Sequence, residues 1–121
     1  MINYHIKQIE IESVNGDVKE YDILIGRNAK GNEEVIKIGK ELCKDNIWFH
    51  FGNSVSSSHI ILCSNGDTIS KRYITQVGAM LFEYKSKVPA GTPVIYSEVK
   101  NVSLTNVLGT IIPRDLRTIK F

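Results

Sequence analysis

The sequence predicts an α+β fold: a single compact domain with a mostly antiparallel sheet, an N-terminal hairpin and two helices. The length of 121 residues suits a single domain with one hydrophobic core, because a domain usually contains about 100 to 200 residues. Seventeen isoleucines stand against seven leucines and three alanines, and β-branched side chains favour strands. Two longer segments, from about residues 32 and 70, instead carry apolar residues at helical spacing.

Residues 4–12 and 18–25 predict an N-terminal β-hairpin. Apolar and polar residues alternate in the first segment, with one break around Lys7-Gln8 that suggests a bulge. Asn15-Gly16 between the segments offers the two positive-φ residues of a type I′ turn.

Two helices and several short strands follow the hairpin. The first helix is expected to begin near Asn32, a good N-cap, with Glu33 and Glu34 in the first turn, where the helix dipole favours negative charge. The second is expected over about residues 70–87, because Pro89 prevents its continuation. The expected strands cover residues 47–50, 59–63, 94–96, 99–103, 110–112 and 116–121.

Composition limits which kinds of partner and which cellular location we expect for the protein. A formal net charge of +2 allows an anionic partner without requiring one. No apolar run approaches the roughly 20 residues of a membrane span, and residues 1–7 lack the features of a secretory leader. Cys43 and Cys63 are therefore expected to be reduced thiols, and the location is expected to be cytoplasmic, without membrane contact.

The segment from Gly26 to Asn32 is the first candidate binding site. A glycine before a helix start lets a ligand approach free N–H groups, and Arg27 and Lys30 add positive charge suited to phosphate. Asn28 and Asn32 offer amide contacts to the same anion, a phosphate or a carboxylate. The alternative is a strand-to-helix turn in which the asparagines only cap the helix and the charges are solvated. The segment matches neither a Walker A loop nor Gly-x-Gly-x-x-Gly.

Trp48 and Phe49 are the second candidate. Successive strand residues point to opposite faces, so one ring belongs in the core and the other could stack on a base. The competing interpretation, the stronger one for Trp48, makes this residue a core anchor.

His50 and His59 fall on consecutive strands of an expected hairpin, with Ser57 and Ser58 in the connecting loop. The hydroxyls and N–H groups of the loop could contact an anion beside the two imidazoles. Alternatively, the histidines only satisfy hydrogen bonds within the fold. A serine nucleophile is disfavoured because no Gly-x-Ser-x-Gly surrounds it, and no metal-ligand spacing occurs. We therefore expect no catalytic residue, no metal and no cofactor.

Scattered basic residues form the third candidate. They would create a phosphate-tracking surface if they shared a face with Arg27 and Lys30, although solvated charges are the commoner outcome. They are Lys71, Arg72, Lys85, Lys87, Lys100 and the basic residues of 114–120.

Three ordered stretches together resemble the NFACT-R family, the RNA-binding domain of NFACT proteins in ribosome-associated quality control. They are Ile25-Gly26-Arg27-Asn28 with Asn32, Ile47-Trp48-Phe49-His50, and Ser58-His59-Ile60-Ile61. Two later stretches also look like family motifs: Tyr84-Lys85-Ser86-Lys87 and Val94-Ile95-Tyr96-Ser97. The resemblance is strongest over residues 20–121 and looks like a small standalone member, with the family's lysine-rich stretch replaced at 101–106.

The resemblance implies a non-catalytic RNA-binding module for tRNA or ribosomal RNA, linked to translation or ribosome-associated quality control. The implied contact residues are Arg27, Asn28, Lys30, Asn32, Trp48, His50, Ser57, Ser58, His59 and Lys87. The alternatives are a module that docks on a ribosomal or quality-control protein and, behind it, a small hydrolase or nuclease. DNA stays an alternative partner, and the oligomeric state is open.

Overall fold

The computed structural model describes residues 2–121. Its main element is a six-stranded sheet with the strand order β1-β2-β4-β3-β5-β8. Every neighbouring pair in this sheet is antiparallel. In that order the strands are Tyr4–Glu12, Val18–Gly26, Ile60–Leu62, Ile47–Phe51, Val94–Glu98 and Arg117–Ile119. With helices and strands in this arrangement, the α+β prediction is confirmed.

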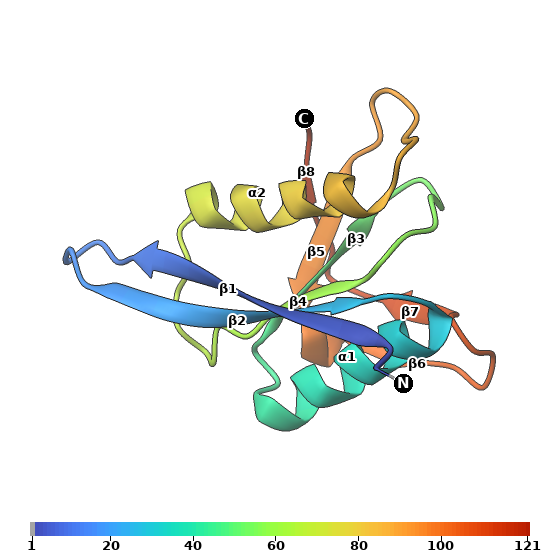
Figure 1. Ribbon diagram of the computed structural model, residues 1–121, viewed down its shortest axis with the longest axis horizontal. Helices are drawn as coiled ribbons and strands as arrows, with labels where there is room; N and C mark the ends of the chain where they lie inside the picture. Colours follow the sequence, from blue (N-terminus) through green and yellow to red (C-terminus); the bar gives the residue numbers. More distant parts are fainter. Residues whose placement is uncertain (1) are drawn as a thin grey trace.

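Both faces of the sheet are covered (Figure 1). Helix α1 (Ala29–Leu42) lies on one face together with a small second sheet of β6 (Val102–Leu104) and β7 (Ile111–Pro113). Helix α2 (Lys71–Ala79) and the 3₁₀ turn η1 (Met80–Tyr84) lie on the other face. A second 3₁₀ turn, η2 (Val99–Asn101), connects β5 to β6. The fold therefore has two hydrophobic cores, one on each side of the sheet.

The central strand β3 contributes to both cores. Trp48 packs in the core under α1, and Phe49 packs in the core under α2. Each side chain is 0% exposed. The prediction that these residues face opposite sides is confirmed, but the idea that one ring is free to stack on a base is wrong, since a helix covers each face.

The hairpin departs from the prediction at its turn. Strands β1 and β2 pair one for one from Tyr4 opposite Gly26 to Glu12 opposite Val18, so the expected bulge is wrong. The connection is a loop of residues 13–17, in which Gly16 has a φ of +85° and Asn15 stays outside the left-handed region. The N–H of Gly16 donates to the Ser13 carbonyl, and a type I′ turn is therefore wrong.

Three element boundaries also differ. Helix α1 begins earlier than expected, with Asn28 as its N-cap instead of Asn32. Helix α2 ends at Ala79 and continues only as the 3₁₀ turn η1 to Tyr84. Within 99–103, the first three residues form η2 instead of a strand.

Helix α1 sits very close to the chain that enters β1. A Cβ atom on Gly31 would lie 1.7 Å from the carbonyl oxygen of Asn3, so a larger residue would push the helix away. Within residues 2–121, no helix combines the length and the apolar character that crossing a bilayer requires.

Candidate functional site

A cavity of about 510 Å³ opens between the start of α1 and the loop that joins β3 to β4. Seven of the ten predicted site residues line it: Arg27, Asn28, Asn32, His50, Ser57, Ser58 and His59. The other lining residues are Ala29, Ser54, Val55, Ser56, Tyr84 and Gly109. Segments that lie far apart in the sequence thus meet at one end of the sheet.

Gly26 allows the first turn of α1 to pack on the end of β2. A Cβ atom at this position would lie 2.0 Å from the Asn32 Oδ1 and 2.8 Å from the Asn32 Cα and backbone nitrogen. Because this close approach excludes a side chain, Gly26 fixes where α1 begins relative to the sheet. The guanidinium of the next residue, Arg27, is exposed at the cavity, with its Nη1 3.5 Å from the Ile2 carbonyl oxygen.

Two asparagine side chains build the cavity wall. The Asn28 Oδ1 accepts from the Gly31 N–H at 2.8 Å, and its Nδ2 donates to the Asn3 Oδ1 at 3.2 Å. The Asn32 Oδ1 accepts from the His59 N–H at 3.0 Å, and its Nδ2 donates to the Ser57 carbonyl at 3.4 Å. Asn32 therefore joins α1 to the start of β4 instead of capping the helix. Both amides are engaged within the protein, so we assign them a positioning role.

The predicted neighbourhood of His50 and His59 is confirmed, with ring centroids 4.2 Å apart. The buried Trp48 Nε1 donates to the His59 Nδ1 at 3.0 Å. Because Nδ1 accepts this bond, the neutral imidazole of His59 carries its proton on Nε2. Trp48 thus stands behind the cavity and selects the tautomer of a lining residue, a role different from the stacking considered for it.

Burial keeps both imidazoles uncharged. Desolvation, with a smaller contribution from the neighbouring His50, lowers the pKa of His59 to about 3. Desolvation also lowers the pKa of His50, against the carbonyls of Phe51 and Ser57, which favour protonation. At pH 7 the pair therefore offers hydrogen bonds and ring surfaces but no positive charge. Arg27 is then the one positively charged side chain among the lining residues.

Tyr84 is a lining residue that the sequence reasoning did not place in the site. Its hydroxyl is buried and makes no hydrogen bond of acceptable geometry within residues 2–121, although the Lys7 ammonium lies 5.5 Å from the ring centroid and its contact with Tyr84 raises the pKa of Lys7. Tyr84 belongs to the stretch Tyr84-Lys85-Ser86-Lys87, which looks like a family motif, and this motif was the signal that could have found it. Gly109 also reaches the cavity, because its N–H donates to the Glu33 Oε2 at 3.1 Å and holds the β6–β7 loop against α1.

Three predicted site residues do not line the cavity. Trp48 lies behind His59 and is fully buried. Lys30 is exposed on the first turn of α1, and Lys87 is exposed in the segment after η1. Lys30 and Lys87 are therefore left outside the cavity as surface charges.

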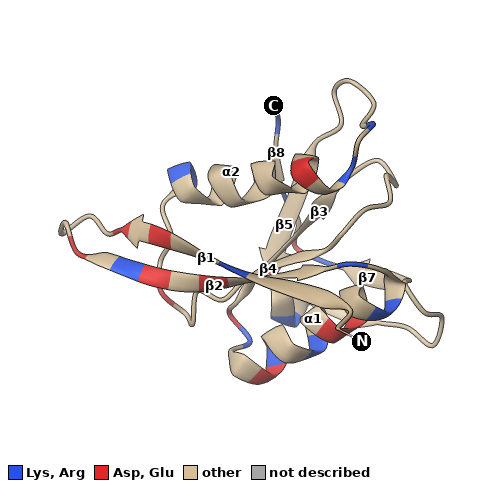
Figure 2. Ribbon diagram, viewed as in Figure 1, with Lys and Arg blue, Asp and Glu red and all other residues tan. Residues whose placement is uncertain are grey.

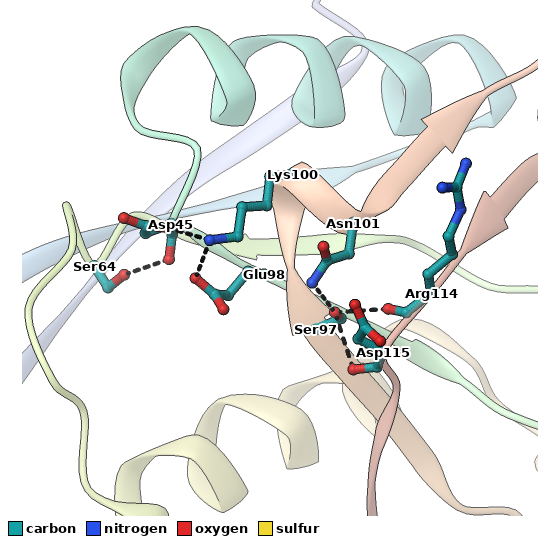
Figure 3. Close-up of polar contacts among 8 residues, drawn as sticks. All are labelled: Asp45, Ser64, Ser97, Glu98, Lys100, Asn101, Arg114 and Asp115. Carbon is teal, nitrogen blue, oxygen red and sulfur yellow. Dashed lines mark hydrogen bonds and ion pairs between the residues drawn. The ribbon is translucent and has the colours of Figure 1, made fainter.

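Three of the scattered basic residues lie among carboxylates, as the solvated-charge alternative for them predicts. Lys71, Lys100 and Arg117 line a second cavity of about 650 Å³ together with Asp45, Asp67, Glu98 and Asp115. The Lys100 ammonium lies 3.0 Å from the Asp45 carboxylate and 3.3 Å from the Glu98 carboxylate (Figure 3). Figure 2 likewise shows acidic residues beside basic ones along β2 and α1. These charges neutralise one another locally and do not extend the positive charge of Arg27.

The second cavity is bordered by a polar network at the end of β5 (Figure 3). The Ser97 hydroxyl lies 2.9 Å from the Arg114 carbonyl and 3.2 Å from the Asp115 carbonyl, and it accepts from the Asn101 Nδ2 at 3.1 Å. These contacts tie the chain after β7 to β5. No group of three or more His, Cys, Asp or Glu side chains in residues 2–121 is placed to hold a metal ion.

Comparison with solved structures supports the fold. The C-terminal part of the fibronectin/fibrinogen-binding protein from Streptococcus suis superposes with a TM-score of 0.68 at 22% sequence identity. The match covers 94% of this chain and 44% of that chain, so the present chain spans less than half the length of its structural relative. No curated protein matches the sequence.

The family comparison covers most of the chain. The family model described as the NFACT protein RNA binding domain matches residues 9–115. This range contains every residue that lines the cavity at the start of α1. The chain therefore belongs to the NFACT RNA-binding domain family.

Proposed function

We propose that the chain binds RNA at the cavity between α1 and the β3–β4 loop, and that Arg27 holds a backbone phosphate at its mouth. The observation that carries this proposal is the exposed guanidinium of Arg27 beside the first turn of α1. Arginine offers a planar set of donors that matches phosphate, and a helix start carries partial positive charge.

The rest of the cavity suits the less charged parts of a nucleotide. Serine hydroxyls and neutral imidazoles can hydrogen-bond ribose and base edges, which unpaired RNA exposes. Lys30, on the same helix turn, adds attraction at longer range. We propose no reaction, because the family to which the chain belongs is described by RNA binding.

Membership of this family favours tRNA or ribosomal RNA as the physiological partner, within translation or ribosome-associated quality control. The proposal places contact with a ribosomal or quality-control protein second, since the cavity is polar and no feature of it selects a protein ligand. DNA offers the same phosphates, so the decisive measurement includes it.

A salt-titrated binding experiment tests the proposal. Fluorescence anisotropy would follow binding of the protein to tRNA, unstructured RNA and duplex DNA. Arg27→Ala is expected to weaken RNA binding about tenfold or more, because a charge-assisted contact is lost. It should also reduce the slope of log K against log salt by about one. The double variant with Lys30→Ala should bind more weakly still and keep its fold.

Arg117→Ala is the matched control, because it removes the same type of charge from the second cavity. Its RNA affinity is expected to match that of the wild type. Equal affinities for Arg27→Ala and Arg117→Ala, with both proteins folded, would refute a phosphate site at the start of α1. Association with ribosomal or quality-control proteins would instead favour a protein-docking module, if it survives nuclease treatment and high salt and disappears only with apolar substitutions.

A further inference from the structure

We propose that the cavity receives the base of one unpaired nucleotide, whose phosphate Arg27 holds at the mouth. This inference rests on the proposed function and names what enters the same site. It predicts that the chain selects single-stranded nucleotides over duplex, at equal phosphate content.

The charge distribution within the cavity is the first argument. Arg27 is the ionised lining residue, and it is exposed, whereas His50 and His59 are held neutral by burial. A phosphate buried among neutral groups would lose its hydration without a compensating cation. A neutral, polar and flat group such as a base meets no such penalty.

Free hydrogen-bonding groups inside the cavity are the second argument. His59 is 5% exposed and lines the cavity, and its Nδ1 is occupied by Trp48. Its Nε2–H has no acceptor among residues 2–121 and is left for a ligand. The buried Tyr84 hydroxyl also has no partner there. Buried polar groups are normally satisfied, so the Tyr84 hydroxyl, the one buried side-chain polar atom of residues 2–121 without a hydrogen bond, and the His59 Nε2–H at the same cavity together favour a polar ligand.

The size and shape of the cavity agree with this ligand. Its volume of about 510 Å³ falls in the usual range for small-molecule sites, roughly 300 to 1,000 Å³. The rings of His50 and His59, which both line the cavity and are tilted by 35° to one another, also offer it aromatic surface against which a base could pack. A single nucleotide therefore fits in volume, charge and hydrogen bonding.

Direct titration with nucleoside 5′-monophosphates tests the inference. NMR spectra of the full chain would follow the ring protons of His50 and His59 while AMP, GMP, CMP, UMP or inorganic phosphate is added. At least one monophosphate is expected to shift these signals and to bind about tenfold more tightly than inorganic phosphate. Equal affinity for inorganic phosphate and for all four monophosphates would overturn the inference.

Tyr84→Phe supplies a second measurement in a variant that is expected to stay folded, because the deleted hydroxyl makes no hydrogen bond of acceptable geometry in the free protein and its charged neighbour, Lys7, is exposed to solvent. It is expected to weaken monophosphate binding about threefold to tenfold. Tyr96→Phe, which deletes a hydroxyl at the second cavity, is the control and should leave this affinity unchanged. Equal affinities for the two variants would also contradict a base in the cavity.

The two proposals fail in different ways. If polymeric RNA binds through Arg27 while single strands and duplexes of equal length bind alike, the phosphate site stands and the base cavity is refuted. If Arg27→Ala leaves RNA binding intact, the proposed function itself is refuted.

Discussion

Gly26→Ala is expected to destabilise the domain and to remove RNA binding at the cavity together. The new Cβ would lie 2.0 Å from the Asn32 Oδ1 and 2.8 Å from the Asn32 backbone. The side chain of Asn32 can rotate away, but the first turn of α1 must then shift as well. Overpacking of this kind costs roughly 1 to 3 kcal/mol in the free energy of unfolding.

The loss of binding follows from what Asn32 holds. Its amide accepts from the His59 N–H and donates to the Ser57 carbonyl, so its displacement releases the serine loop and the start of β4. The Arg27 guanidinium moves with the same turn. RNA affinity should therefore fall at least as far in Gly26→Ala as in Arg27→Ala, even under conditions where the variant is folded.

Urea denaturation and anisotropy would measure the two effects, with Gly78→Ala as the control. A Cβ at Gly78 would lie 3.0 Å from the Ile119 Cδ1, the flexible end of a side chain on the α2 face of the sheet. This variant should bind RNA as the wild type does. Wild-type affinity in folded Gly26→Ala would show that the position of α1 does not set the site.

Acid is expected to destabilise the protein through His59, over a pH range where most carboxylates are still ionised. Burial, with a smaller contribution from His50, lowers the folded pKa of His59 to about 3, from an ordinary value of about 6.5. The unfolded chain therefore binds the proton more readily, and this contribution to stability is complete above pH 6.5. This contribution is lost progressively as the pH falls from 6.5 toward 3. By pH 4.5 the loss in the free energy of unfolding is about 2 to 3 kcal/mol.

Denaturation of the wild type and of His59→Gln at pH 7.0, 6.0, 5.0 and 4.5 would isolate this effect. His59→Gln lacks the titrating group, so its free energy of unfolding should decline less steeply over the same interval. Asp45 and Asp67 have lowered pKa values through hydrogen bonds with Lys100 and Lys19, and they also lose stability in acid. Because the wild type and His59→Gln both retain these carboxylates and His50, whose pKa burial also lowers, the difference between the two curves belongs to His59 and its interaction with His50. Parallel curves would show that His59 is not buried in the neutral form.

The sequence was informative about strands and less so about helix ends. Alternation and turn residues predicted the hairpin and most strands, because these patterns arise from local geometry. The start of α1 was misplaced because Asn28 and Asn32 are both good caps. Only a tertiary contact, from the His59 N–H to Asn32, assigns Asn32 elsewhere. Rules that consider only residues close in sequence cannot predict this contact between residues 32 and 59.

Seven predicted residues line one cavity, and their contact with RNA stays a prediction. These residues are arginine, asparagine, serine and histidine in short segments at strand ends. The sequence shows that such side chains can contact an anion, although it does not show where they lie. The burial of both Trp48 and Phe49 was missed, although Ile23-Leu24-Ile25 and Ile60-Ile61-Leu62 are continuous apolar runs typical of strands covered on both faces. The neutral state of the histidines depends on burial and could not be predicted from residue type.

The hydrogen bond between Trp48 and His59 gives the molecule a built-in optical probe. Trp48 is the only tryptophan of the chain, and its indole contacts the back of a side chain whose front lines the cavity. Any ligand that polarises or displaces this imidazole will change the emission of the indole. Occupancy could thus be followed by intrinsic fluorescence, on unlabelled protein and in real time.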